Sequence, residues 1–248
     1  WQNITLSAEQ IRFIADRNFG IGCDQVLLVE TAEASDADFR YRIFNADGSE
    51  VAQCGNGARC FARFVRDKQL SNKSTILVDT QSGQLLLNFD DDGGITVNMG
   101  KPHHHPEVIP LNTLQEEKFY TVEVEGVEKA FGAVSMGNPH AVLQVSDVSK
   151  PIEMIGQALE SHAFFPERAN IGFMQVIDRK HIKLRVYERG TGETLACGSG
   201  ACAAVVVGIE HHLLDADVQV ELPGGTLNIH WSGRDTPVFM TGPAVTVF

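Results

Sequence analysis

The sequence predicts an α/β fold of the α+β kind, made of two pseudo-symmetric halves, each with a mostly antiparallel β-sheet around one helix. Four short blocks of sequence occur twice in the same order. In each half, alternating apolar runs bounded by Gly, Asp and Pro surround one marked helix start. With 248 residues and 43% apolar composition, the chain can bury two cores. We place the halves at 1–101 and 102–248, and leave open whether the last few residues return to the first half.

The internal repeat follows one spacing along the chain. Residues 42–44 (RIF) resemble 185–187 (RVY), and residues 54–58 (CGNGA) resemble 197–201 (CGSGA). Two further pairs keep nearly the same spacing: 21–26 with 171–176, and 83–85 with 225–227. Each block alone could arise by chance among short apolar strings, but the shared order makes chance improbable for the set. Matching blocks should therefore form matching elements.

The expected elements are short strands and four helices. The segment after Cys54 has apolar residues at i, i+3, i+4 and i+7 from Ala58, with arginines off that stripe, which predicts a partly exposed helix. Its partner, 201–209, holds three consecutive valines that favour a strand, but the repeat favours a buried helix. Prolines at 102–110 mark the seam between the halves. Further helices are expected at 8–18 and 154–162, and strands at 39–44, 85–89, 96–99, 183–187, 218–222 and 226–231.

Charge and composition argue against several classes of protein. The formal net charge of −12, without a Lys/Arg-rich run, disfavours binding to nucleic acid or to anionic membranes. No apolar run reaches the roughly 18–20 residues that cross a bilayer, and residues 1–10 lack the features of a signal peptide. Five cysteines, an odd number, argue against a disulfide framework and fit a reducing compartment. We therefore expect a soluble, cytoplasmic protein.

The two cysteine turns suggest chemistry on opposite faces of one carbon atom. Cys54 and Cys197 each precede Gly-x-Gly at a predicted helix start, where free N–H groups and the positive end of the helix dipole meet. Such a position lowers the pKa of a thiol below its free value of about 8.5, so the thiol can act as a base. The same N–H groups can hold a carboxylate. If the halves pack with a pseudo-twofold relation, two thiols face one cleft, which suits inversion of an α-carbon by one acid and one base.

Other interpretations of these residues are less specific. A single turn of this kind is more often structural than catalytic, and the duplication is what favours catalysis. Cys60 and Cys202 are expected to be core residues without a chemical role, and a zinc site built from them with Cys54 and Cys197 would use unusual spacings. The histidines at 103–105 are expected in a solvated loop. No dinucleotide or phosphate-binding motif occurs, so neither a cofactor nor a metal is implied.

Longer motifs around the two cysteines resemble those of the diaminopimelate epimerase family. They are 45–50 (NADGSE) leading to 54–60 (CGNGARC), then 135–140 (SMGNPH), and 187–190 (YERG) leading to 196–201 (ACGSGA). The likeness runs through nearly the whole chain. It implies two similar domains, each a β-sheet rolled round a central helix, that close on LL- or meso-diaminopimelate. It also implies a place in lysine and peptidoglycan precursor synthesis, without pyridoxal phosphate or a metal.

The resemblance implies roles for individual residues. Cys54 and Cys197 would be the acid and the base, exchanging roles with the direction of reaction, and His140 and Glu188 would tune them as titratable neighbours. Phe248 falls where the family has an aromatic dimer contact, so a homodimer is expected. The residues expected to hold the reacting carboxylate are Gly55, Asn56, Gly198 and Ser199, and those expected to bind the rest of the substrate are Gln25, Asn45, Asn138, Asn170, Glu188 and Arg189.

The chain departs from the family pattern at both ends, and two rival functions stay open. The family opens with a strand carrying a GNDF-like segment whose Asn contacts substrate, and this chain starts downstream of it, so we expect a fragment without the first strand. By the same resemblance, we expect the family's last strand to be incomplete at Phe248. The nearest rival is a two-thiol racemase of proline or hydroxyproline, although such a site should be smaller and more apolar. The rival of another class is a non-catalytic thiol or metal-binding protein.

Overall fold

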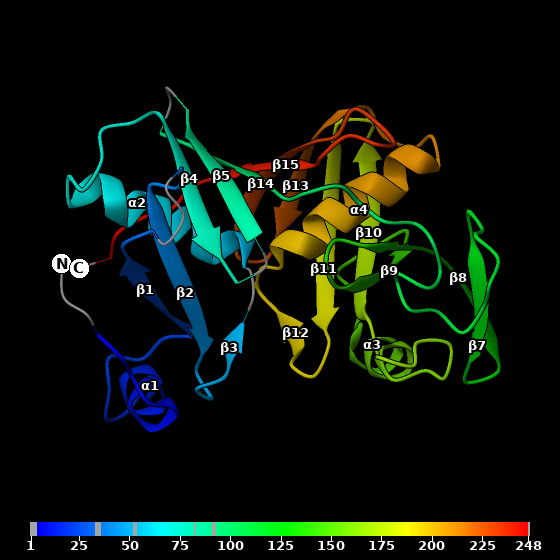
Figure 1. Ribbon diagram of the computed structural model, residues 1–248. Helices are drawn as coiled ribbons and strands as arrows, with labels where there is room; N and C mark the ends of the chain where they lie inside the picture. The colour runs from blue at the N-terminus through cyan, green and yellow to red at the C-terminus, as the bar shows by residue number, and fades with distance from the viewer. Residues whose placement is uncertain (1–3, 33–35, 52–53, 82, 91–92, 248) are drawn as a thin grey trace. The chain divides into compact units, whose positions relative to one another are not determined.

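A computed structural model describes residues 4–32, 36–51, 54–81, 83–90 and 93–247. The chain divides into two compact units: unit 1 is Trp1–Asn98 with Gly242–Phe248, and unit 2 is Met99–Thr241 (Figure 1). Both consist mainly of β-strands with few helices, so the predicted α+β class is confirmed. Among the described residues, the helices are all too short or too polar to span a lipid bilayer.

Unit 1 is a β-sheet packed against one helix. Its elements are α1 (Ala8–Ala15), β1 (Gln25–Glu30), β2 (Phe39–Asn45), β3 (Glu50–Val51), α2 (Gly55–Asp67), β4 (Thr75–Thr80), β5 (Gly83–Phe89) and β6 (Ile95–Asn98). The strand order is β1-β2-β4-β5-β6, and all neighbours are antiparallel except β2 and β4. Because α2 contacts β1, β5 and β6, it lies on one face of this sheet.

Unit 2 repeats this plan and extends it. Its elements are β7 (Tyr120–Val124), β8 (Val127–Ser135), β9 (Pro139–Gln144), α3 (Glu153–Glu160), β10 (Asn170–Asp178), β11 (His181–Glu188), β12 (Gly192–Thr194), α4 (Gly198–Glu210), β13 (Asp217–Leu222), β14 (Gly225–His230) and β15 (Phe239–Gly242). The strand order is β15-β14-β13-β11-β10-β9-β8-β7. Two neighbouring pairs, β11 with β13 and β9 with β10, are parallel.

The predicted repeat is confirmed in the order and direction of the strands. The run β1-β2-β4-β5-β6 matches β10-β11-β13-β14-β15, and the parallel pair β2–β4 matches β11–β13. The central helices α2 and α4 occupy equivalent places between these parallel strands in the sequence. Beyond β10, unit 2 adds β9, β8 and β7, three strands that the sequence analysis did not predict. Among the described residues, β2 is the only strand paired with β1.

The core of unit 1 lies between α2 and the sheet. The stripe predicted for this helix, Ala58, Phe61, Ala62 and Val65, is almost completely buried. Phe61 stacks on Tyr41 of β2, with ring centroids 5.1 Å apart. An aromatic pair of this kind adds about 0.5–1.5 kcal/mol to the stability gained from buried area. The helix that carries Cys54 at its start is therefore anchored to the sheet through Phe61.

Two residues of α2 depart from the predicted pattern. Arg59, expected off the apolar stripe, is only 7% exposed, because the C-terminal segment of unit 1 passes beside it. Its guanidinium donates to Asn56 Oδ1 (2.9 Å) and to the carbonyl oxygen of Pro243 (3.3 Å). Cys60, expected in the core, is exposed, so this part of the prediction was wrong. The C-terminal segment of unit 1 covers α2 at Arg59 and leaves the side at Cys60 open to solvent.

The second central helix, α4, is buried on nearly all sides. It contacts β8, β9, β10, β11 and β14, and residues 200–208 are all buried. The three valines at 205–207 are helical as the repeat predicted, because burial on several sides outweighs their preference for strands. Gly208 allows the next turn to come close, since a Cβ atom there would lie 2.3 Å from Leu214 Cδ1. Cys202 is fully buried, as expected.

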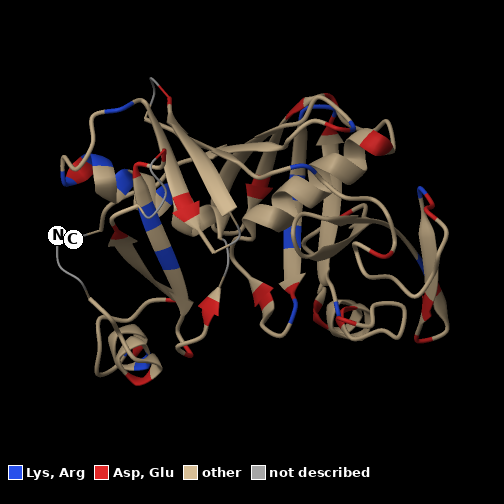
Figure 2. Ribbon diagram, viewed as in Figure 1, with Lys and Arg blue, Asp and Glu red and all other residues tan. Residues whose placement is uncertain are grey.

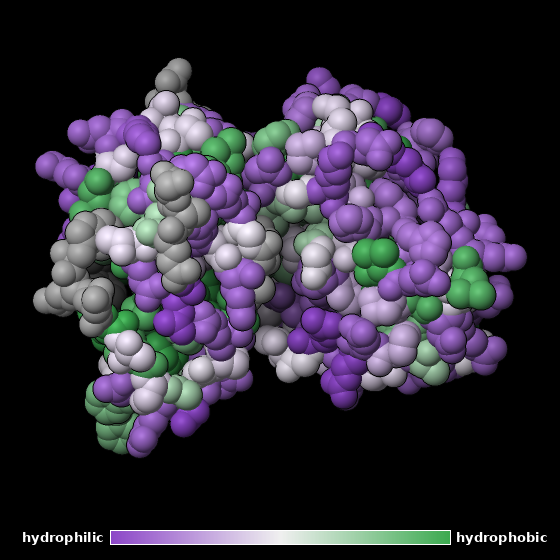
Figure 3. Space-filling view, viewed as in Figure 1, coloured by the Kyte–Doolittle hydropathy of each residue, from purple (hydrophilic) through white to green (hydrophobic). Residues whose placement is uncertain are grey.

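The surface is mixed in charge, and several large apolar side chains are exposed around α1 of unit 1. Acidic and basic residues are interspersed in the view of Figure 2, and the residues drawn there form no continuous basic face. Around α1, the side chains of Phe13, Phe19 and Ile21 are 62%, 82% and 70% exposed, and apolar colours mark this corner in Figure 3. Surfaces of this kind often pack against another segment or another chain.

The packing of α2 predicts different costs for two phenylalanines of the same helix. Phe61→Ala should destabilise unit 1 by about 3–5 kcal/mol, because it leaves a cavity between the helix and the sheet. Phe64, 43% exposed, is the matched control, and Phe64→Ala should cost less than about 1 kcal/mol. Urea unfolding followed by circular dichroism measures both. Equal losses of stability in the two variants would contradict the assigned core.

Candidate active site

Cys54 forms the start of α2, as predicted. It is the N-cap residue, with extended backbone angles (φ −147°, ψ 117°), and its Sγ accepts the N–H of Gly57 at 3.5 Å. Gly55 and Asn56 follow as the first helical residues. The thiol is partly buried. Unit 1 therefore presents a sulfur atom next to backbone N–H groups that the helix does not use internally.

Polar side chains predicted to bind substrate in unit 1 are oriented by their neighbours. Arg59 Nη2 donates to Asn56 Oδ1, so the amide nitrogen of Asn56 is left as a donor for other groups. Gln25 and Asn45 face each other in the register of β1 and β2, and Gln25 Nε2 donates to Asn45 Oδ1 at 3.3 Å. Asn45 Nδ2 in turn donates to Ser49 Oγ. The structure thus brings Gln25 and Asn45 together as a pair at the end of the sheet.

Cys197 occupies the matching position at the start of α4, but its surroundings differ. It is 5% exposed, and its Sγ donates to Glu188 Oε2 at 3.2 Å. Burial raises the pKa of this thiol, and the negative charge of Glu188 raises it further, against an opposing effect of the N–H of Gly200. The prediction that the surroundings of Cys197 favour the thiolate is therefore wrong. The loss of hydration outweighs the helix start, so the sulfur holds its proton.

Glu188 is in direct contact with Cys197, where the sequence analysis placed a neighbour of a thiol. Its second carboxylate oxygen, Oε1, accepts the hydroxyl of Thr194. The two residues lie on adjoining strands, since β11 pairs with β12 and Glu188 faces Gly192 in the register. One oxygen of Glu188 is thus fixed by the hydroxyl, while the other faces the sulfur. This arrangement allows the carboxylate to accept the proton of Cys197 when the sulfur has to lose it.

His140 is an uncharged hydrogen-bond donor in this structure. The residue is 1% exposed, and burial lowers its pKa to about 3, with a smaller lowering by the charge of Arg189. Its Nε2 lies 2.9 Å from Asn138 Oδ1, and because an amide oxygen only accepts, Nε2 carries the hydrogen. Asn138 Nδ2 donates to Ser199 Oγ at 3.4 Å. The expectation that His140 acts by titrating is therefore corrected. It orients Asn138, which contacts the first turn of α4.

Asn170 and Arg189 belong to one network. Asn170 is 3% exposed, its Nδ2 donates to the carbonyl oxygen of Pro139, and its Oδ1 accepts the backbone N–H of Arg189. The amide of Asn170 thus ties the start of β9 to the residue that follows β11, and this leaves it little capacity for substrate. Arg189 Nη1 donates to the carbonyl oxygen of Glu167 at 3.1 Å. Among the described residues, Nε and Nη2 of Arg189 have no protein partner, so two donors of its fork remain for a carboxylate.

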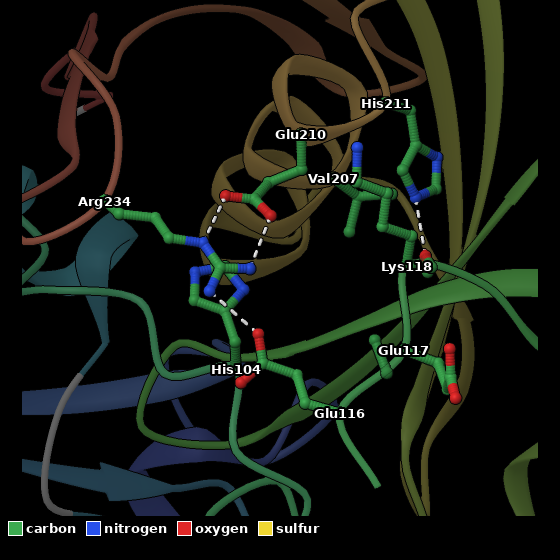
Figure 4. A pocket seen from close by; sticks show the side chains of 10 residues that line it. His104, Glu116, Glu117, Lys118, Val207, Glu210, His211 and Arg234 are labelled. Carbon is green, nitrogen blue, oxygen red and sulfur yellow. Dashed lines mark hydrogen bonds and ion pairs between the residues drawn. The ribbon is translucent and has the colours of Figure 1, made fainter.

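One recess of unit 2 lies elsewhere, at the C-terminal end of α4 (Figure 4). Arg234 pairs with two carboxylates in this recess. Its guanidinium contacts both oxygens of Glu210 at 2.8–2.9 Å and Glu116 Oε1 at 2.8 Å. His104 is half-buried here, 6.2 Å from the Trp231 ring by centroids, so the predicted solvated loop does not extend to it. Because Arg234 is already paired with Glu210 and Glu116, and the recess is at the opposite end of the helix from Cys197, we do not assign it as the active site.

Neither a metal site nor the expected dimer residue is found among the described residues. Among the described residues, no group of three His, Cys, Asp or Glu side chains could hold a metal ion. The placement expected for Phe248 lies outside the described residues. The remaining predicted site residues fall into two sets by unit. Unit 1 contributes Gln25, Asn45, Cys54, Gly55 and Asn56, and unit 2 contributes Asn138, His140, Asn170, Glu188, Arg189, Cys197, Gly198 and Ser199.

Known proteins provide independent comparisons. The family model described as "Diaminopimelate epimerase" matches residues 2–105 and 132–247. A hydroxyproline epimerase from Agrobacterium vitis, with bound trans-4-hydroxy-L-proline, is 16% identical with a TM-score of 0.70, covering 96% of this chain and 78% of its own. A probable proline racemase from Agrobacterium radiobacter is 14% identical with a TM-score of 0.68, covering 97% and 81%.

A third similar structure carries a different name. The Bacillus anthracis phenazine biosynthesis protein of the PhzF family is 18% identical with a TM-score of 0.67, covering 97% of this chain and 87% of its own. At such low identities these three likenesses concern the fold alone. They agree with the two-domain architecture found here.

The burial of His140 predicts a loss of stability in acid. Its folded pKa of about 3 lies below the usual value near 6.5, so the unfolded chain takes up a proton that the native protein does not. Stability should therefore fall as the pH drops from about 6.5 toward 3, by up to about 1.4 kcal/mol per pH unit from this residue.

The matched variant is His140→Gln, whose amide can still donate to Asn138. Urea unfolding at pH 7, 6, 5 and 4 should give a shallower decline for this variant than for the wild type. His103→Gln, at an exposed position, controls for the loss of a histidine. Parallel declines in the wild type and in His140→Gln would contradict the neutral buried state.

Proposed function

Because the chain belongs to the diaminopimelate epimerase family, and is on that ground an isomerase of the epimerase type, we propose that it interconverts LL- and meso-diaminopimelate. Cys54 and Cys197 would move the α-proton, without a bound cofactor. One observation carries the proposal: the two cysteines are the N-cap residues of equivalent central helices in a duplicated fold. A duplicated acid–base group suits a reaction that must serve both faces of one carbon.

In the proposed reaction, the proton leaves one face and returns on the other. In one direction, Cys54 Sγ acts as a thiolate and takes the α-proton, so the Cα–H bond breaks and an S–H bond forms. Cys197 then gives its proton to the opposite face of the carbanion. The contact of Cys197 with Glu188 supports this order, since the resting sulfur is a donor. The forward reaction leaves Cys54 protonated and Cys197 as the thiolate, so in the reverse direction Cys197 Sγ takes the α-proton and Cys54 gives its proton to the opposite face.

The first turns of α2 and α4 would stabilise the intermediate. As the α-proton leaves, negative charge moves onto the reacting carboxylate. The N–H groups of Gly55, Asn56, Gly198 and Ser199 belong to these first turns and would face that charge. The side chain of Asn56 can contribute as well: Arg59 donates to its Oδ1, which leaves its Nδ2 as a donor for the same charge. Preorganised donors of this kind act most strongly in a site that excludes water.

Arg189 favours a substrate with a second charged end. Diaminopimelate has a second carboxylate beyond the reacting centre, and proline does not. The free Nε and Nη2 atoms of Arg189 match the bidentate geometry of a carboxylate. We therefore propose diaminopimelate ahead of proline or hydroxyproline as the substrate. The cellular setting proposed with it is lysine and peptidoglycan precursor synthesis in the cytoplasm, by a homodimer.

The proposed mechanism predicts that each thiol is indispensable. Cys54→Ala and Cys197→Ala should each abolish formation of the meso isomer from the LL isomer, because one remaining thiol serves only one face. Chiral chromatography after incubation with LL-diaminopimelate measures the product. Cys60→Ala, on the exposed side of α2, should keep the wild-type rate.

Two outcomes would contradict parts of this proposal. Near-normal turnover by either alanine variant would contradict the two-base mechanism. A wild-type protein that inverts L-proline and leaves LL-diaminopimelate unchanged would overturn the proposed substrate while leaving the mechanism in place.

The proposed role of Arg189 predicts a defect in substrate binding. Arg189→Ala should raise the KM for diaminopimelate at least about tenfold, since a charge-assisted hydrogen bond contributes roughly 1.5–3 kcal/mol. Arg189→Lys should give an intermediate KM, because it keeps the charge and loses the planar fork. Steady-state kinetics on both variants tests this. An unchanged KM for Arg189→Ala would remove the reason for preferring a dicarboxylate.

A further inference from the structure

A buried carboxylate lies directly behind the turn that carries Arg189. Glu160, the last residue of α3, is 5% exposed. Acidic side chains are seldom buried to this degree unless hydrogen bonds or a positive partner compensate for the lost hydration. None of the functions considered so far uses Glu160. Its contacts therefore indicate what this side chain does.

The carboxylate of Glu160 binds the turn after Arg189. Oε1 accepts the backbone N–H of Gly190 at 2.9 Å. Gly190 has φ of 72°, in the left-handed region that glycine adopts at low cost, so the chain turns sharply at this point. The backbone N–H of Arg189 is held from the other side by Asn170 Oδ1 at 3.0 Å. The consecutive backbone N–H groups of Arg189 and Gly190 thus both donate to buried side chains.

The same carboxylate also holds the loop that receives the guanidinium of Arg189. Oε1 accepts from Arg168 Nη1 at 3.3 Å, and the carbonyl oxygen of Glu160 accepts the N–H of Ala169 at 3.2 Å. Arg168 has φ of 60°, a conformation that a residue with a side chain adopts only when its surroundings enforce it. The preceding residue, Glu167, provides the carbonyl oxygen for Arg189 Nη1. Glu160 therefore supports the turn that follows Arg189 and the loop that receives its guanidinium.

We propose that Glu160 is a positioning residue that presents the free edge of the Arg189 guanidinium to a carboxylate of the substrate. Glu160 does not touch the substrate in this proposal and acts through Arg189. A guanidinium fork binds a carboxylate in two places only when its plane is set correctly, so holding Arg189 at both ends selects dicarboxylates. The inference rests on the proposed function, because it takes Arg189 as the residue that binds the distal end of diaminopimelate.

The test combines kinetics with a measurement that needs no substrate. Glu160→Ala should raise the KM for diaminopimelate about tenfold, with a smaller change in kcat, since the acid–base pair is left in place. Glu160→Gln should fall between Glu160→Ala and the wild type, because it keeps an acceptor for Gly190 and loses the charge facing Arg168. Glu153→Ala, at the exposed start of the same helix, is the matched control and should leave the KM unchanged.

A double variant separates positioning from general support of the fold. If Glu160 acts through Arg189, adding Glu160→Ala to Arg189→Ala should change the KM by less than about twofold, whereas independent effects would multiply. Hydrogen–deuterium exchange at the amides of Arg189 and Gly190 should become faster in Glu160→Ala and stay unchanged in Glu153→Ala.

Each result decides a separate point. An unchanged KM in Glu160→Ala, unchanged exchange at Gly190, or multiplying effects in the double variant would each overturn the proposal. A wild-type protein that does not epimerise diaminopimelate would instead overturn the proposed function. In that case, exchange at Gly190 would decide whether Glu160 holds the turn.

Discussion

The first turns of α2 and α4 impose the constraint on which the rest of the site depends. A helix leaves its first N–H groups without internal partners, and Ser, Thr, Asp or Asn usually caps them. Here both cap residues are cysteines. Cys54 Sγ accepts one N–H at 3.5 Å, and the side chain of Cys197 makes no cap hydrogen bond. Sulfur is a weak acceptor, so donors of both turns remain available to an anion, and the missing cap at Cys197 costs about 1 kcal/mol.

Burial of the two helices offsets that cost and also sets the properties of the thiols. α4 is enclosed so completely that Cys197 loses its hydration, and Glu188 beside it adds a negative charge. Both effects keep the proton on sulfur, yet the carboxylate is also the nearest acceptor for that proton. A thiol that is a poor base at rest can thus still take part in both directions of a proton transfer. The uncharged His140 orients the side chain of Asn138 and adds no charge to the site.

Much of the architecture could be predicted from the sequence because the duplication relates one half to the other. The repeat predicted that the valines at 205–207 form a helix, although their propensity favours a strand. The strands β7, β8 and β9 lie outside the repeated blocks, so the repeat gives no basis for predicting them. Within the site, the positions of Cys54, Cys197 and Glu188 followed from motifs. The burial of Arg59, the exposure of Cys60 and the raised pKa of Cys197 did not, because long-range packing decides them.

The central claim is that two different groups serve the two faces of one α-carbon. Incubation of the protein with LL-diaminopimelate in D₂O, with deuterium followed by mass spectrometry in both isomers at low conversion, tests it most directly. Two bases predict deuterium at the α-carbon of the meso product from the start, because the acid on the opposite face has exchanged with D₂O. Recovered LL-diaminopimelate stays unlabelled at first, because the thiol that removed its α-proton returns the same proton when the reaction reverses. Equal early labelling of both isomers would contradict the account and would indicate a single base.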